Sequence, residues 1–260
     1  MISYGCGPQP MSSLWRRRKD VISPLGYYPV QVNYSYLKYK LHCPSLWPLL
    51  LVAAMVLLTL FSVQARDYFR LDQDLLDTVA QNYGGQAKQR LLDWQSLINN
   101  DQSSNDQEKL VKVNAFFNQQ EFISDQLLWK DKDYWATPVE FLVQNGGDCE
   151  DFSIAKYFTL KKLGVDESKL NLTYAKAVEL NQAHMVVTYY GQPNDEPLIL
   201  DNLIDEIRPA SLRPDLLPVF SFNGVGLWLA KERGRGKLVG NSSRYKHWQD
   251  LLGRMPEGLN

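Results

Sequence analysis

Gly146-Gly147-Asp148-Cys149-Glu150-Asp151 stands directly ahead of a helix-like run, Phe152–Leu163. Asp148 is a residue type that caps helix N-termini, so we expect the helix to begin close to Cys149. The first turn of a helix favours a thiolate, because its N–H groups lack helical acceptors and the dipole is positive there. The two glycines leave room for a substrate backbone to approach. Cys149 is therefore a candidate nucleophile.

Three carboxylates beside Cys149 oppose its ionisation. Asp148, Glu150 and Asp151 raise the pKa of a neighbouring thiol through repulsion between like charges. A hard cation would remove this conflict, and calcium takes roughly six to eight oxygen ligands, among them carboxylates. The spacing is not that of an EF-hand, and acidic residues in a first turn also complement the helix dipole without any metal. The residues alone leave both interpretations open.

Two histidines follow Ala65, and one of them lies in a predicted strand. His184 begins an apolar, β-branched stretch that ends at Tyr190, whereas His247 lies among basic and aromatic residues and is expected at the surface. A histidine at the start of a strand is commonly structural. A poised cysteine needs a base, however, so His184 is the candidate partner of Cys149.

Asp201 is the candidate for the residue that orients this imidazole. It follows the apolar run Leu198–Leu200, where burying a carboxylate without a partner would be costly. A hairpin through Gly191–Pro197 would place this run beside the histidine strand, with Asp201 in reach of the ring. Asn202 and Asp205 are weaker alternatives for the same role.

Helical patterns come first along the chain after Ala65, and strand patterns follow. Apolar residues recur at helical spacing over residues 72–119. Thr137-Pro138-Val139-Glu140 predicts a capped helix that runs to about Gln144 and stops at Asn145-Gly146-Gly147. Strands are predicted at Leu170–Val178, His184–Tyr190, Leu198–Asp201 and within Val219–Leu229. The predicted class is α+β, with an N-terminal helical lobe packed on an antiparallel sheet.

Leu46–Val63 is an uncharged apolar stretch of membrane length. Basic residues precede it and Val63-Gln64-Ala65 ends it with small residues, which predicts a secretory signal cleaved after Ala65. The stretch is longer than the roughly 7–15 residues of a signal core and approaches the roughly 20 that span a bilayer, so an uncleaved inner-membrane anchor is the alternative. In both cases the chain from Arg66 onward is expected outside the cytoplasm, since the basic flank stays inside.

The predicted domain organisation follows from this N-terminus. Residues 1–45 are a cytoplasmic extension or precede the true start of the protein, and residues 46–65 are the signal core and cleavage site. Residues 66–260 form the working domain, with a helical lobe over 66–125 and a catalytic core over 126–260. Six of the 28 basic and one of the 29 acidic residues lie in the first 65, so the rest carries a net charge of −6. Such a domain is not expected to bind nucleic acid and is compatible with cation binding.

Four phrases of the sequence carry a resemblance to a known family. They are WATPVEFL (Trp135–Leu142), GDCED (Gly147–Asp151), AHMV (Ala183–Val186) and LDNL (Leu200–Leu203). Each is weak alone, but GDCED with the downstream histidine and LDN is fairly specific. Over roughly residues 68–235 the chain resembles the bacterial transglutaminase-like cysteine proteinases, whose fold is related to that of papain.

The resemblance implies a calcium-dependent cysteine endopeptidase of the periplasm, with its catalytic cysteine at a helix N-terminus. Carried over by position, the catalytic nucleophile, base and orienting acid are Cys149, His184 and Asp201. The implied calcium ligands are Asp148 and Glu150, with Asp151, Asn194 and Asp195 as candidates to complete the set.

The resemblance also implies two partners. The substrate would be a large repeat-containing surface adhesin, cut at a paired-alanine site near its N-terminal retention module, which releases cells from a biofilm. An inner-membrane receptor for cyclic di-GMP would sequester the enzyme when that messenger is abundant. Two alternatives stay open: acyl transfer or amide hydrolysis by the same triad, and a non-catalytic, calcium-stabilised periplasmic binding module with an inert cysteine.

Overall fold

The computed structural model of the protein describes residues 68–231 and 234–259. The N-terminal extension, the apolar stretch and the expected cleavage site all lie outside these residues, so the interpretation of the N-terminus stays a prediction. Among the helices that the structure describes, none is long and apolar enough to cross a membrane.

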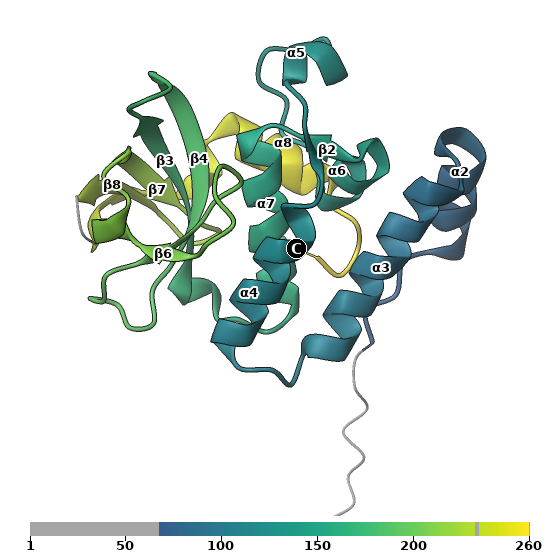
Figure 1. Ribbon diagram of the computed structural model, residues 1–260, viewed down its shortest axis with the longest axis horizontal. Helices are drawn as coiled ribbons and strands as arrows, with labels where there is room; N and C mark the ends of the chain where they lie inside the picture. Colours follow the sequence, from purple (N-terminus) through teal and green to yellow (C-terminus); the bar gives the residue numbers. More distant parts are fainter. Residues whose placement is uncertain (1–67, 232–233, 260) are drawn as a thin grey trace, which may run out of the picture. The chain divides into compact units, whose positions relative to one another are not determined.

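Helices precede the sheet along the chain, as the sequence predicts (Figure 1). The α-helices are α2 (Gln73–Tyr83), α3 (Gly85–Asp101), α4 (Asp106–Phe117), α5 (Asp125–Leu128), α6 (Pro138–Gln144), α7 (Cys149–Lys162) and α8 (Lys246–Arg254). The strands are β1 (Glu121–Phe122), β2 (Gly146–Gly147), β3 (Leu170–Ala177), β4 (Gln182–Tyr189), β5 (Leu198–Leu200), β6 (Arg208–Pro209), β7 (Leu216–Phe222), β8 (Leu227–Lys231) and β9 (Gly234–Gly240). Short 3-10 turns are η1 (Glu167–Lys169), η2 (Ala210–Leu212) and η3 (Ser242–Arg244).

Helices α2, α3 and α4 form the predicted helical lobe. Gly84 separates α2 from α3 with a positive φ of 91°, a backbone conformation that glycine adopts without strain. Helix α3 runs to Asp101, and its buried residues include Leu91, Trp94 and Ile98. The indole N–H of Trp94 donates to the Thr159 hydroxyl at 2.8 Å, and both side chains are buried. This contact joins the lobe to α7.

The seven-stranded sheet is antiparallel throughout, in the order β6-β5-β4-β3-β7-β8-β9. All four predicted strand regions are strands. The register pairs Ala175 of β3 with His184 of β4, and Val187 of β4 with Leu200 of β5. Pro218 lies where the register between β3 and β7 shifts, a position at which a strand tolerates the missing N–H.

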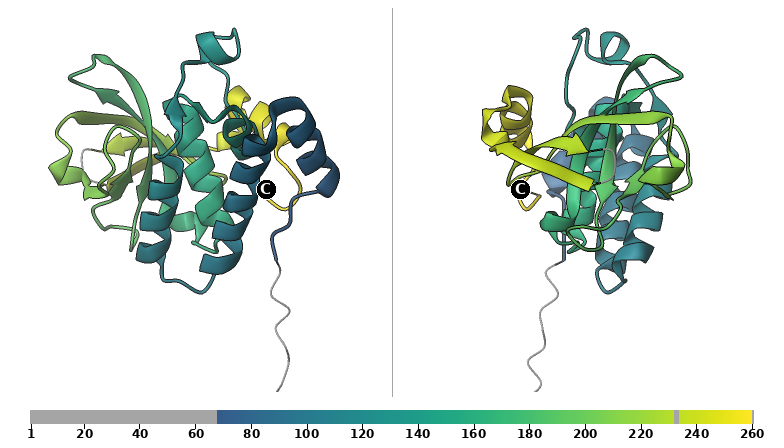
Figure 2. Two further views of the ribbon diagram at one scale, coloured as in Figure 1. Left: turned by 45° about the vertical axis from the view of Figure 1, so that its right-hand side comes forward. Right: turned by 90° about the vertical axis from the view of Figure 1, so that its left-hand side faces the viewer.

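Helix α7 packs against one face of this sheet. It contacts β3 and β4 on one side and α4 and α6 on the other, so it lies at the centre of the domain (Figures 1 and 2). Large aromatic side chains fill the core around α7. Among them are Trp94, Trp135, Phe222 and Trp248, all at most 2% exposed. The opposite face of the sheet carries a smaller apolar cluster around Ala175 and Val186. The α+β class with a helical lobe on an antiparallel sheet is confirmed.

The turn between α6 and α7 sets the position of Cys149. Thr137 and Glu140 form the predicted capping box, with Pro138 in the first turn of α6. Asn145 ends α6 in the left-handed conformation, with φ at 64°. Helix α7 then begins at Cys149, so both helix boundaries that the sequence predicts are confirmed.

The two glycines of this turn have a different role from the one predicted. Gly146 and Gly147 form β2, which pairs in parallel with β1. A Cβ on Gly146 would lie 1.9 Å from the carbonyl oxygen of Glu121, and one on Gly147 would lie 2.2 Å from a carboxylate oxygen of Asp151. The room beside them is filled by the protein itself, so the expectation that they admit a substrate backbone is wrong.

Candidate active site

Asp151 fixes the start of α7. Its buried carboxylate accepts hydrogen bonds from the N–H of Ala136 at 2.7 Å and the N–H of Asp148 at 3.3 Å. The first bond reaches back to the chain ahead of α6, and the second caps α7 from within. Because both bonds are to backbone groups, they hold the GDCED segment in one conformation.

Cys149, the first residue of α7, is partly buried and has a free thiol. Its sulfur lies 2.7 Å from Oε2 of Glu150 and contacts the backbone of Met185 on β4, the residue next to His184. Burial raises the pKa of the Cys149 thiol, and the carboxylates of Glu150 and Asp148 raise it further, while the hydrogen bond with the Met185 backbone lowers it. The thiol is therefore held protonated, and the predicted conflict between thiol and acids is confirmed.

His184 and Asp201 lie in direct contact. Nε2 of His184 is 2.7 Å from Oδ1 of Asp201, and the two residues are 2% and 1% exposed. Asp201 directly follows β5, which pairs beside β4 as the predicted hairpin requires. With Nε2 donating to the carboxylate, Nδ1 is the ring nitrogen left to exchange a proton with another group.

A second group of carboxylates lies at the start of α7. Asp125, Asp148 and Asp151 bring carboxylate oxygens within 4.8 Å of one another, and Asp148, Cys149 and Glu150 bring ligand atoms equally close. Oδ1 of Asp125 and Oδ1 of Asp148 are buried with no hydrogen-bond partner. Unpartnered buried oxygens that converge in this way fit a hard divalent cation.

Electrostatics in this cluster point the same way. Burial raises the pKa of Asp125 to about 6, and repulsion from Glu150 adds to the effect. Burial, followed by Glu150 and Asp151, raises the pKa of Asp148 to about 9. Burial also holds the pKa of Asp151 well above its usual range. Each shift comes first from burial, and repulsion between neighbouring carboxylates adds to it.

Comparison with known proteins gives the family. The model of the bacterial transglutaminase-like cysteine proteinases matches residues 89–213. Solved structures of Legionella pneumophila LapG are similar to this chain: one at 45% identity and a TM-score of 0.61, covering 71% of this chain and 97% of that chain. The chain belongs to the bacterial transglutaminase-like cysteine proteinases. No curated protein matches it.

Two further LapG structures bear on calcium. An EGTA-treated form is 46% identical with a TM-score of 0.62 and covers 71% of this chain and 97% of its own. A calcium-bound form is 46% identical with a TM-score of 0.61 and covers 71% of this chain and 99% of its own. Calcium therefore binds in this proteinase family, and this chain is a cysteine protease of the LapG type by family.

Two buried basic side chains of the proteinase converge on Asp201, and no sequence motif indicates either. Burial lowers the pKa of one of them, Lys156, to about 7. Arg213 donates to Oδ2 of Asp201 at 2.7 Å and also pairs with Asp215. Lys156 of α7 is 1% exposed and donates to the Asp201 carbonyl at 3.0 Å. Burial raises the pKa of Asp201, but hydrogen bonds from His184, Leu203 N–H and Arg213 outweigh it and bring the pKa to about 2.

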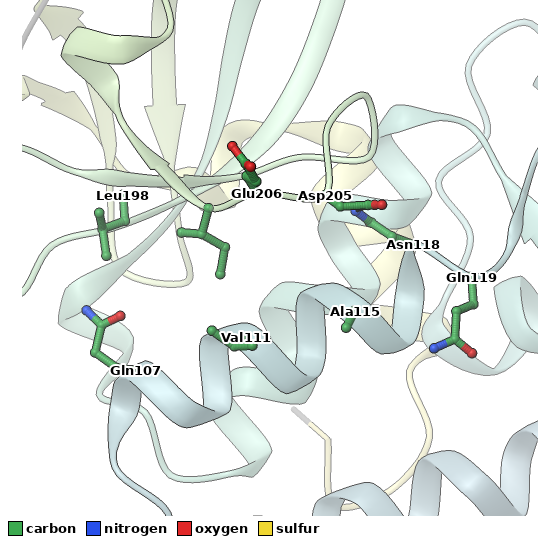
Figure 3. Close-up of a pocket in the computed structure, with 9 residues that line it drawn as sticks. Gln107, Val111, Ala115, Asn118, Gln119, Leu198, Asp205 and Glu206 are labelled. Atoms are coloured by element: carbon green, nitrogen blue, oxygen red, sulfur yellow. Dashed lines mark hydrogen bonds between the residues drawn. The ribbon is translucent and has the colours of Figure 1, made fainter.

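Helix α4 holds the loop that carries Asp201. The Asn118 amide donates to the Asp201 carbonyl at 2.9 Å and to the Asp205 carboxylate at 3.0 Å. Figure 3 shows Asn118 and Asp205 pointing toward each other beside a hollow between α4 and this loop. Asp205, a weaker alternative for the orienting acid, thus contacts α4, and no His184 contact with Asn202 is found among the described residues.

The structure does not bring Asn194 and Asp195 to the carboxylate cluster. They lie in the loop after Tyr189, at the end of β4 opposite to His184, and a strand advances about 3.3 Å per residue. Asp195 instead accepts a hydrogen bond from the N–H of Gln192. Asp125, which no sequence signal indicated, takes the place that these residues were expected to fill.

His247 lies at the surface, as expected. Its side chain is 39% exposed, its Nε2 is 3.6 Å from Asp133, and its ring packs near Trp135.

The charge on Asp201 predicts a specific loss of stability in acid. Its folded pKa of about 2 lies below its ordinary value of 3.8, so its stabilising contribution is complete above about pH 4 and disappears as the pH falls toward 2. The difference corresponds to about 2 kcal/mol. We expect the free energy of unfolding of wild type, measured in urea, to drop by about this amount more than that of Asp201→Asn between pH 4 and pH 2. Equal pH dependence in the two proteins would contradict the assignment.

Proposed function

We propose that the protein is a calcium-dependent periplasmic cysteine endopeptidase with the triad Cys149, His184 and Asp201. One observation carries the proposal: His184, buried and 2.7 Å from Asp201, lies on β4 directly before Met185, whose backbone hydrogen-bonds the Cys149 thiol. Family membership supports thiol protease chemistry at this place.

The proposed reaction proceeds through an acyl-enzyme. Nδ1 of His184 takes the thiol proton, and the sulfur of Cys149 bonds to the scissile carbonyl carbon. An N–H in the first turn of α7 stabilises the oxyanion, because it has no acceptor in the helix. The imidazolium then protonates the leaving amine as the C–N bond breaks. The ring next takes a proton from water, whose oxygen bonds to the thioester carbon; the C–S bond breaks, and the ring returns the proton to the sulfur of Cys149. Asp201 keeps the ring oriented and its positive charge balanced.

The carboxylate cluster fits calcium, and we assign Asp125, Asp148, Glu150 and Asp151 to hold it. When bound, the ion balances the negative charge beside Cys149 and so favours its thiolate. The calcium-bound LapG structure supports a calcium ion in this chain as well. Calcium thus links the folded state of the α7 start to the reactivity of the thiol.

The proposed substrate is the N-terminal region of a large repeat-containing adhesin, cut at a paired-alanine site so that the cell leaves its biofilm. The proposed regulator is an inner-membrane cyclic di-GMP receptor that sequesters the protease. The proposed location of the enzyme is accordingly the periplasm. Both proposals rest on family resemblance and on similarity to LapG. Incubation of the protein from residue 66 onward with adhesin N-terminal segments tests the first: two fragments support an endopeptidase, and crosslinked or aminated product would replace it by an acyltransferase.

Substitution of the nucleophile tests the chemistry. Cys149→Ala removes the attacking sulfur, so we expect cleavage of such a segment to fall by at least about 10³-fold while the calcium-loaded fold is kept. Cleavage is followed by gel and mass spectrometry, and the fold by thermal unfolding. Retained proteolysis in the purified variant would reject the mechanism.

Substitution of Asp125 tests the metal site. Asp125→Asn removes the charge of a carboxylate whose Oδ1 is buried without a hydrogen-bond partner. We therefore expect the calcium affinity, measured by titration calorimetry, to fall at least about 10-fold. Asp250→Asn, an exposed change on α8, is the matched control and should bind calcium as wild type does. Unchanged affinity in Asp125→Asn would remove this residue from the site.

The same cluster predicts how pH acts on the calcium-free protein. Because the carboxylate pKa values are raised in the folded state, that state holds more protons than the unfolded chain, and stability in EGTA should fall as the pH rises from 6 to 9. Saturating calcium replaces these protons, so its stabilising effect on the melting temperature should be greatest at pH 9. A calcium effect that does not grow with pH would contradict this account.

A further inference from the structure

Apolar side chains on β7, β8 and β9 leave an uncovered surface close to the proposed catalytic residues. Val219, Leu229 and Val239 are 55%, 54% and 46% exposed. A hollow of about 320 Å³ is lined by Phe220, Leu227, Leu229, Val239, Asn241 and Tyr245, none of which carries a charge. A second hollow, of about 360 Å³, includes Tyr174, Ala183, Val219 and Phe220 in its lining. Because Phe220 lines both, the two hollows form one strip.

This strip leads to the cysteine. The ring of Phe220 lies 4.8 Å from that of Tyr174 and 6.4 Å from that of Tyr245, measured between ring centroids. The Tyr174 hydroxyl is 3.4 Å from Oε1 of Glu150, whose other oxygen contacts the Cys149 sulfur. The strip is therefore continuous with the site at which a polypeptide would be cut.

We propose that this strip, from Tyr174 over Phe220 to Leu229 and Val239, binds an extended apolar segment of the polypeptide substrate on one side of the scissile bond. The inference rests on the proposed endopeptidase function. A protease must hold the chain beside the bond that it cuts, and binding energy from such remote contacts positions the reacting carbonyl. The hollow beside Leu229 and Val239 has an uncharged lining, whereas Lys176 contributes to the lining of the second hollow. The uncharged part selects apolar side chains, because a charged side chain would lose its hydration there without gaining a partner.

The test uses the adhesin segment that wild type cuts into two fragments. Leu229→Glu places a charge in the strip without touching the triad or the carboxylate cluster. We expect KM for the segment to rise at least about 10-fold with kcat within about 2-fold of wild type, the pattern for loss of binding shared by ground state and transition state. Val239→Glu should act in the same way. Leu238→Glu is the matched control, because Leu238 is 59% exposed on β9, the strand of Val239, and lines neither hollow.

A scan of the substrate completes the test. Each apolar residue within eight positions of the cut is replaced by serine in turn, and one such change should raise KM for wild type and for Leu238→Glu but not for Leu229→Glu. This non-additivity identifies the residue that occupies the strip. If no apolar residue shows it, the proposal is overturned.

The outcomes separate the two proposals. If folded, calcium-loaded wild type cuts no adhesin segment, the endopeptidase proposal and the strip fall together. If wild type cuts and Cys149→Ala does not, but both glutamate variants in the strip keep the wild-type KM, only the strip falls. A changed oligomeric state on gel filtration with an unchanged KM would assign the strip to a contact between copies of the chain and would also overturn the proposal.

Discussion

Repulsion among carboxylates at the start of α7 is the constraint on which the site depends. Asp151 must be buried there, because its bonds to Ala136 N–H and Asp148 N–H hold the segment that presents Cys149. That burial places it within 4.8 Å of Asp125 and Asp148, so the same bonds that position the nucleophile concentrate negative charge beside it. A thiolate at Cys149 would add a further negative charge to this space. A divalent cation relieves all of these repulsions at once.

Asp201, the buried acid beside His184, has a different electrostatic environment from the carboxylates at the start of α7. Asp201 has His184 and the Leu203 N–H on one carboxylate oxygen and Arg213 on the other, so it stays ionised with a pKa of about 2. Among the residues that the structure describes, no basic side chain pairs with Asp148, and burial with repulsion from neighbouring acids raises its pKa to about 9. The protein therefore supplies its own positive charge where a carboxylate must always be ionised, and leaves it out where reactivity can depend on a bound ion. Asp201 therefore stays ionised beside His184 whether or not an ion is bound, whereas the ionisation of Cys149 depends on a bound ion.

Local sequence signals predicted the elements whose cause is local. The capping box Thr137–Glu140 and the stop at Asn145 lie within a few residues of the groups they bond, so both ends of α6 followed from the chain itself. Strand β4, which carries His184, and strand β5, which ends just before Asp201, could be predicted for the same reason, because a short hairpin joins them. Strand β9 and helix α8 escaped prediction, because glycine and basic residues dominate β9 and the apolar residues of α8 are few.

Contacts between residues far apart in the sequence could not be predicted from these local signals. Arg213 and Lys156 reach Asp201 from 12 and 45 residues away, and Ala136 reaches Asp151 from 15, none with a motif of its own. The error over Asn194 and Asp195 has the same origin: oxygen-rich loops are common, and only the direction of β4 shows that this loop lies at the far end of the strand. The glycines Gly146 and Gly147 were read as space for substrate, whereas Glu121 and Asp151 fill that space.

The ionisation of Cys149 is the quantity to measure. The rate of alkylation by iodoacetamide, followed against pH in calcium and in EGTA, gives the pKa of this thiol, and Cys149 is the one cysteine in the chain after Ala65. The account predicts a midpoint lower by about two pH units or more in calcium, with His184→Ala losing most of the rapid alkylation near neutral pH. The same midpoint in calcium and in EGTA would contradict the claim that a bound cation governs the reactivity of this site.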